Sequence, residues 1–147
     1  MSETTREVAA ALLLGTCGRV LLQQRDDVPG ILYPGMIGLF GGHREGGETY
    51  LACVQREIEE ETGHRVPLER FEEIVTMVAA YPDGSTVRGA YFLVRDVPAE
   101  TLVITEGTLL AALPKDLPRL LNRMTPSACL ASRLFLIGAS ATHGPSI

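Results

Sequence analysis

Runs of apolar residues separated by turn-forming residues predict a β-hairpin near the start of the chain. Residues 8–15 (VAAALLLG) and 19–25 (RVLLQQR) are two such runs, and each predicts a strand. The intervening residues 16–18 (TCG) have the composition of a short hairpin turn. Residues 26–35 are rich in Pro, Gly and Asp and predict a loop, whereas residues 36–40 (MIGLF) predict a short buried strand.

The next segment predicts a glycine-rich loop that leads into a helix. Residues 41–48 (GGHREGGE) contain four glycines in eight positions, which opposes regular structure, so we expect all of them to form a loop. Residues 49–62 predict an α-helix that begins at a Thr49 cap and ends at Gly63. Three apolar side chains recur on one face of this helix, namely Leu51, Val54 and Ile58.

Three further strands are predicted after the helix. Residues 71–81 (FEEIVTMVAAY) and 86–94 (TVRGAYFLV) are the first two, and the PDGS sequence between them has the residues of a tight turn. Residues 102–105 (LVIT) predict another short strand, just before Glu106.

The C-terminal third predicts two helices, each opened by a proline. They cover residues 114–124 (PKDLPRLLNRM) and 126–138 (PSACLASRLFLIG), and residues 138–147 are expected to form a loose tail. Strands combined with a few helices predict a mixed α/β domain in which helices pack on the faces of a sheet.

The composition predicts one globular domain over residues 1–147. The chain is 46% hydrophobic and 21% charged, which is typical of a folded protein with a substantial core. Its net charge of −5 argues against general nucleic-acid binding, which needs a basic surface. A phosphate-bearing substrate stays compatible with this charge, because a bound cation can reverse the local field.

The cysteines and the hydropathy favour a reducing cytoplasm. Cys17, Cys53 and Cys129 are widely spaced and form no CxxC pair, so neither a disulfide framework nor a cysteine zinc site is predicted. The N-terminal MSETTRE lacks the basic and apolar regions of a signal peptide. The apolar runs are too short to cross a bilayer, so we expect no membrane partner.

Four glutamates lie within residues 57–61, and their positions on the predicted helix are electrostatically unfavourable. Glu57, Glu60 and Glu61 fall within an arc of about 100°, whereas Glu59 points away. They repel one another across one turn, and they lie near the negative end of the helix dipole. A solvated acidic face and a divalent-cation site both explain the cluster. The glycine-rich loop before the helix favours the cation site, because it can bring backbone carbonyls towards the acidic arc.

The order of these residues resembles the Nudix box of the Nudix hydrolases. The signature is G-x5-E-x7-R-E-U-x-E-E-x-G-U, in which U is a bulky aliphatic residue. His64 replaces the last aliphatic residue, a difference that concerns packing more than chemistry. The flanking VLLQQR and GLFGG sequences, and the EG at Glu106, are also similar to the family. The matched positions are Gly42, Glu48, Arg56, Glu57, Ile58, Glu60, Glu61 and Gly63.

The resemblance implies an α/β/α sandwich, with a mixed β-sheet between helices, that hydrolyses a nucleoside diphosphate linked to another moiety. It implies Mg²⁺ or Mn²⁺ as the cofactor, and it gives Arg56 and Glu48 the role of orienting the ligands and tying the loop to the helix. Glu106 is the candidate for the remaining base or ligand. Without an evident Ser or Cys nucleophile system, direct attack by water is the simpler chemistry. The implied metal ligands are Glu57, Glu60, Glu61 and the Gly41 carbonyl.

The sequence leaves the substrate open. A small nucleotide such as a (d)NTP fits a short chain without an added domain, and ADP-ribose, nucleotide sugars and dinucleoside polyphosphates are alternatives. Tyr81 lies 17 residues after His64, which resembles the dinucleoside-polyphosphate branch but is also ordinary turn sequence. Arg25 is as consistent with a phosphate contact as with a surface position. The alternative of another class is a nucleotide-sensing module with little activity, and a homodimer is compatible with the sequence.

Overall fold

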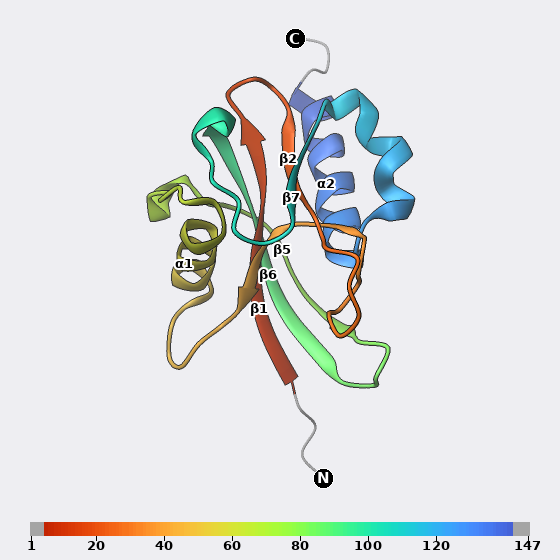
Figure 1. Ribbon diagram of the computed structural model, residues 1–147. Coiled ribbons are helices and arrows are strands. Elements are labelled where there is room, and N and C mark those ends of the chain that lie inside the picture. The colour runs from red at the N-terminus through yellow and green to blue at the C-terminus, as the bar shows by residue number, and fades with distance from the viewer. Residues whose placement is uncertain (1–4, 143–147) are drawn as a thin grey trace.

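The structure is a computed structural model that describes residues 5–142, and it consists of one mixed sheet and the helices that cover it (Figure 1). The strands are β1 Thr5–Gly15, β2 Val20–Gln24, β3 Ile37–Gly38, β4 Phe40–His43, β5 Glu72–Ala80, β6 Thr86–Val97 and β7 Thr108–Ala112. The α-helices are α1 Tyr50–Thr62 and α2 Pro126–Thr142. The 3-10 helices are η1 Leu68–Arg70, η2 Ala99–Thr101 and η3 Pro114–Arg123.

Strand β1 lies at the centre of the sheet and organises it. It pairs in parallel with β6 along one edge, and β5 follows β6 in antiparallel orientation. Along its other edge β1 pairs first with β4, through Val8–Ala11, and then with β2, through Leu13 and Leu14. Strands β3 and β7 both pair with β2. Because β4 and β2 share one edge of β1, the glycines of β4 lie close to the middle of the sheet.

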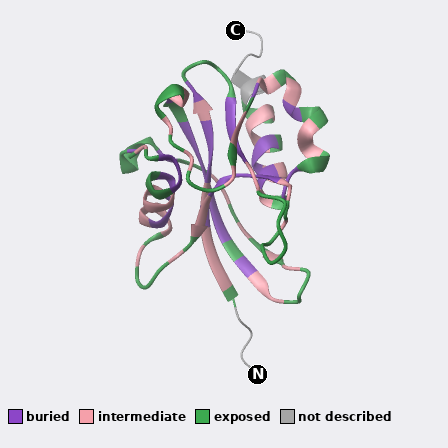
Figure 2. Ribbon diagram, viewed as in Figure 1, coloured by how far each residue is buried: buried purple, intermediate pink, exposed green. Residues whose placement is uncertain are grey.

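Two hydrophobic cores lie on opposite faces of this sheet, as alternation along β1 and β2 requires. Helix α1 covers one face and α2 with η3 covers the other, so the predicted α/β/α sandwich with a mixed sheet is confirmed (Figures 1 and 2). The α1 core includes Leu13, Leu21, Phe40, Val54 and Ile58. The α2 core includes Leu12, Leu22, Ile37, Leu93, Leu117 and Ala128.

Helix α1 forms as its end signals predict. The Thr49 hydroxyl accepts a hydrogen bond of 3.0 Å from the Ala52 N–H. Gly63 adopts a left-handed φ of 75°, and its N–H donates to the Glu59 carbonyl at 2.8 Å. The apolar face packs on the sheet, as expected.

Two predictions around the helix were wrong. Residues 41–43 belong to β4 and pair with β1, because neighbouring strand partners satisfy their backbone groups despite the two glycines. Residues 102–105 do not form a strand: the Val103 N–H donates to the Thr62 carbonyl and the Thr105 N–H to the Glu61 carbonyl. That segment therefore lies along the end of α1. The additional strand of the sheet is β7, which was not predicted from the sequence.

The C-terminal predictions need correction in detail. The first helix is the 3-10 helix η3, and Pro118 in its interior lacks the N–H that an α-helix would use. Helix α2 continues to Thr142, so residues 138–142 are helical and not a loose tail, whereas residues 143–147 lie outside the described part. Within residues 5–142, no helix has the length and apolar character needed to cross a membrane.

Replacing Gly63 by alanine should destabilise the protein through backbone conformation alone. Its φ is 75°, and a Cβ added there would meet no atom within 4 Å. Holding alanine in the left-handed region costs about 1 kcal/mol, which we expect to measure as a lower free energy of unfolding in urea. Gly47→Ala is the matched control, because that site is equally open but has no positive φ. Equal stabilities for the two variants would contradict the assigned role of Gly63.

Candidate active site

The Arg56 guanidinium is the centre of the predicted site. It binds both oxygens of Glu48, at 2.7 Å from Nη2 and 3.2 Å from Nε. Its Nη1 donates to Glu57 Oε1 at 2.9 Å and to Glu60 Oε2 at 3.2 Å, and its Nη2 donates to the His43 carbonyl at 3.1 Å. One side chain thus connects the helix, the loop and β4.

Glu48 closes the loop between β4 and α1. Its Oε1 accepts the Glu45 N–H at 2.8 Å, and its backbone carbonyl accepts Arg44 Nη1 at 3.1 Å. The Arg56 hydrogen bonds, together with the Glu45 N–H, lower the pKa of Glu48 to about 2. The carboxylate is therefore ionised at neutral pH and holds the loop against α1.

Gly42 permits the close approach of β4 to Glu57. A Cβ added at Gly42 would lie 2.5 Å from the Glu57 Cδ and 2.6 Å from each carboxylate oxygen. Every side chain larger than hydrogen would therefore displace the carboxylate. Burial raises the pKa of Glu57, and the neighbouring Glu60 and Glu106 charges raise it further. The hydrogen bond and the charge of Arg56 partly oppose this rise.

Glu61 is the buried member of the acidic arc, with 4% of its surface exposed. Its Oε2 accepts the Gly41 N–H at 2.9 Å, and its Oε1 faces Gln23 Nε2 at 3.5 Å. Burial, followed by the charges of Glu57 and Glu106, raises the pKa of Glu61 to about 8. In the absence of a metal, this carboxyl group is largely protonated at neutral pH.

The two exposed glutamates of the helix point in different directions, as their positions on the helix predict. The Glu60 side chain is 58% exposed and its carboxylate pairs with Arg56, on the same side as Glu57. The Glu59 carboxylate pairs instead with Arg65 at 3.1 Å, away from the acidic arc.

Glu106 reaches the same site from a different part of the chain. It lies just before β7, and its charge raises the pKa of both Glu57 and Glu61, which places its carboxylate near them. Gln23 Nε2 donates to the Glu106 backbone carbonyl at 3.0 Å. Gln23 was not among the predicted site residues. An amide within the apolar strand β2 is a signal that could have identified it, because a buried amide needs hydrogen-bonding partners.

The donor chemistry of the cluster fits a divalent cation. Carboxylate oxygens are the ligands that Mg²⁺ and Mn²⁺ prefer, and the mutual repulsion of Glu57, Glu61 and Glu106 is what a cation would relieve. Glu57 and Glu60 face Arg56, whereas Glu61 faces the Gly41 N–H and Gln23. Within residues 5–142, no three acidic, His or Cys side chains therefore form a ready metal-binding group.

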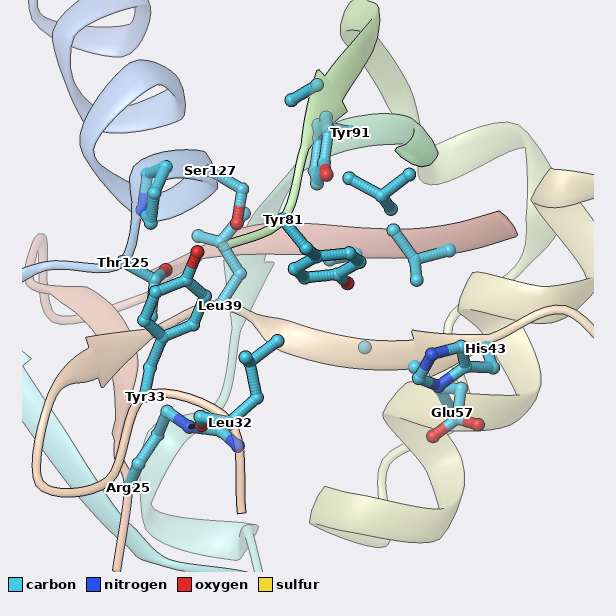
Figure 3. Close-up of a pocket in the computed structure, with 18 of the residues that line it drawn as sticks. Arg25, Leu32, Tyr33, Leu39, His43, Glu57, Tyr81, Tyr91, Thr125 and Ser127 are labelled. Carbon is cyan, nitrogen blue, oxygen red and sulfur yellow. Dashed lines mark hydrogen bonds between the residues drawn. The ribbon is translucent and has the colours of Figure 1, made fainter. Parts of the chain in front are cut away.

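A pocket of about 530 Å³ opens beside this cluster (Figure 3). Glu57 and His43 lie together at one end, Tyr33, Thr125 and Ser127 lie at the other, and Tyr81 and Tyr91 lie between them. Glu106 also lines the pocket. The acidic cluster and an aromatic surface therefore belong to the same cavity.

Two segments that are distant in the sequence build the far end of the pocket. The loop 26–35 contributes Leu32 and Tyr33, and the start of α2 contributes Ser127. Arg25 and Tyr81, which the sequence offered as candidate substrate contacts, both line the pocket. The sequence did not identify the rest, because their convergence depends on pairing between distant strands.

Replacing Glu48 by glutamine should reduce the sensitivity of the protein to acid. The pKa of Glu48 falls from 4.5 to about 2 in the folded protein. A lowered pKa contributes stability above the unfolded pKa, and this contribution is lost as pH falls through the folded one. Between pH 4.5 and about 2, the urea midpoint of the metal-free wild type should therefore fall more steeply than that of Glu48→Gln. An equally steep fall would contradict this role, and Glu69→Gln on the exposed η1 is the control.

Comparison with known proteins supports the same interpretation. Residues 4–118 match the NUDIX domain model. The MutT NUDIX hydrolase from Burkholderia pseudomallei aligns with a TM-score of 0.73 at 23% identity, over 90% of this chain and 98% of its own. The MutT protein from Methanosarcina mazei Go1 aligns with a TM-score of 0.75 at 16% identity, over 99% of each chain.

A longer protein shares the same fold. The bifunctional NMN adenylyltransferase/ADP ribose pyrophosphatase from Francisella tularensis, complexed with AMP and Mn ion, aligns with a TM-score of 0.64 at 19% identity, over 94% of this chain and 42% of its own. A comparison with curated protein sequences gave no match. The structural neighbours establish the shared fold, and the domain match spans more than half of the chain. The chain therefore belongs to the NUDIX-domain family of pyrophosphohydrolases.

Proposed function

We propose that the protein hydrolyses the pyrophosphate linkage of a small nucleotide, such as a (d)NTP, in the presence of Mg²⁺ or Mn²⁺. The observation that carries this proposal is the shared cavity, which has Glu57 at one end and is lined by three tyrosines and by Glu106, whose charge acts on Glu57 (Figure 3). The acidic end suits a cation with its phosphates, and the aromatic end suits a nucleoside. A cytoplasmic location is part of the proposal.

The acidic arc is the proposed cation site. Glu57, Glu60 and Glu61 would hold the cation, together with the Gly41 carbonyl. The cation supplies neutralisation of phosphate charge and Lewis-acid activation of water. The Gly41 N–H already donates to Glu61, so strand β4 and the helix meet at this point.

Glu106 is the proposed general base. Its side chain is exposed on the loop before β7, where a water molecule can reach it. The hydrogen bond from Gln23 to its backbone carbonyl fixes the loop at this position. Its carboxylate would accept a proton from the attacking water, which then adds to phosphorus as the pyrophosphate bond breaks.

The size of the cavity favours a single nucleotide. A volume of about 530 Å³ is within the range of small-molecule sites, and the described residues form one aromatic end. A dinucleoside polyphosphate would have to place its second base outside this cavity. A sensing module with little activity is disfavoured, because all the box carboxylates are present and three of them, Glu48, Glu57 and Glu60, are paired with Arg56.

Metal-dependent turnover of a nucleotide panel tests the proposal. The purified protein should release phosphate or pyrophosphate from at least one nucleoside triphosphate in the presence of Mg²⁺ or Mn²⁺, and EDTA should abolish this release. ADP-ribose, a nucleotide sugar and a dinucleoside tetraphosphate complete the panel. Faster hydrolysis of one of these would redirect the proposal to that class, and no metal-dependent turnover on any compound would refute it.

Replacing Glu60 by glutamine should separate the proposed ligand from a merely acidic surface. Loss of a metal ligand should lower kcat by about 100-fold or more, whereas the fold should persist because Glu60 is exposed. Glu59→Gln is the matched control: the residue is adjacent, exposed and also paired with an arginine. Steady-state kinetics and circular dichroism measure the two effects. Full activity in Glu60→Gln, or an equal loss in Glu59→Gln, would show that the ligand assignment is wrong.

A further inference from the structure

Three of the four tyrosines of the chain line the pocket. They come from separate segments: Tyr33 from the loop 26–35, Tyr81 from the residue after β5, and Tyr91 from β6. The fourth, Tyr50, is the first residue of α1, and its hydroxyl donates to Glu7 at 3.3 Å. Three tyrosines therefore share the pocket, and Tyr33 lies at the end opposite Glu57 (Figure 3).

The Tyr81 ring is held by a cation on one side. The Arg6 guanidinium carbon lies 4.9 Å from the ring centroid, which is a cation–π distance. Asp83 holds Arg6 through a contact of 3.5 Å and is itself fixed by Ser85, whose N–H and hydroxyl donate to it at 2.9 and 2.6 Å. The ring is thus fixed against Arg6 while it lines the pocket.

The polar groups around these rings are mainly hydroxyls. Besides the tyrosines, Thr125 and Ser127 line this end, and Ser127 forms a hydrogen bond with Tyr91. A hydroxyl donates or accepts as its partner requires. Among the described residues that line the pocket there is no Asn, Gln or Asp, and the glutamates lie with the phosphate end.

Arg25 is the arginine among the described residues that line the pocket, and its side chain is hydrogen-bonded within the protein. Its Nε donates to the Leu32 carbonyl at 2.9 Å, next to Tyr33 in the loop. This bond positions the loop that forms one wall of the pocket, so we assign Arg25 a structural role there.

We propose that this end of the pocket binds the base of the nucleotide by stacking on Tyr81, with Arg6 supporting the ring, and accepts purines and pyrimidines alike. The proposal rests on the proposed function, because that function places the phosphates at the acidic end. A site with a fixed hydrogen-bonding partner can reject an analogue by 10⁴-fold or more, whereas this pocket offers groups that reorient. We therefore expect kcat/KM for ATP, GTP, CTP and UTP to agree within about tenfold.

Steady-state kinetics of matched variants tests the stacking surface. Loss of base stacking in Tyr81→Leu should raise KM for each nucleotide by about tenfold, with kcat changed by less than about threefold. Tyr81→Phe keeps the ring and should restore most of the lost affinity, and Arg6→Ala should raise KM by a smaller factor. Tyr50→Leu is the matched control, because Tyr50 also lies beneath an arginine, Arg44 at 5.3 Å, but outside the pocket. An unchanged KM in Tyr81→Leu, or a strong preference for one base, would overturn the proposal.

A binding measurement without metal separates this proposal from the hydrolase proposal. Adenosine and uridine carry no phosphate, so their binding does not depend on the acidic end. We expect each to shift the NMR signals of the Tyr81 ring and to leave those of Tyr50 in place, whereas ribose should shift neither. Such shifts without turnover of any nucleotide would refute the hydrolase alone. Turnover without any shift at Tyr81 would refute the base site alone.

Discussion

The hydrogen bonds of Arg56 are the interaction on which the site depends. One planar guanidinium binds Glu48 through two nitrogens and still donates to Glu57, Glu60 and the His43 carbonyl. A lysine could not do this, because its ammonium is a point charge without the planar arrangement of donors. The loop, the helix and β4 are therefore brought together by a single side chain, which also positions the Glu48, Glu57 and Glu60 carboxylates.

The acidic arc is tolerated because the charges of its members are reduced in two ways, by pairing with Arg56 and by protonation. Glu57 and Glu60 share the Arg56 charge, although burial still raises the pKa of Glu57. Glu61 is buried, and its pKa of about 8 keeps it largely protonated without a cation. A divalent cation would replace the proton on Glu61 and compete with Arg56 for the Glu57 and Glu60 carboxylates. The repulsion among the carboxylates, which is unfavourable in the metal-free protein, therefore favours metal binding.

Local features of the sequence were sufficient for the helix and its acidic arc. The Thr49 cap, the Gly63 end and the division between Glu59 and Glu60 follow from helical geometry within 15 residues. The predictions failed where a distant partner decides the conformation. Residues 41–43 form a strand because β1 lies beside them, and residues 102–105 run along α1 because its last carbonyls accept their N–H groups.

The construction of the pocket explains why the Nudix box predicts the type of reaction better than it predicts the substrate. The three carboxylates of the acidic arc come from α1, and the helix meets the sheet at Gly42, where only hydrogen leaves room for Glu57. The base end instead combines the loop 26–35, Tyr81 after β5, the strand β6 and the start of α2. Thr125 and Ser127 lie beyond residue 118, where the match to the NUDIX domain ends. The proposed metal ligands are therefore specified by a compact motif, whereas the proposed base Glu106 lies outside it. The surface that meets the nucleotide base is built partly from chain outside the recognised domain and is free to differ among proteins that share the motif.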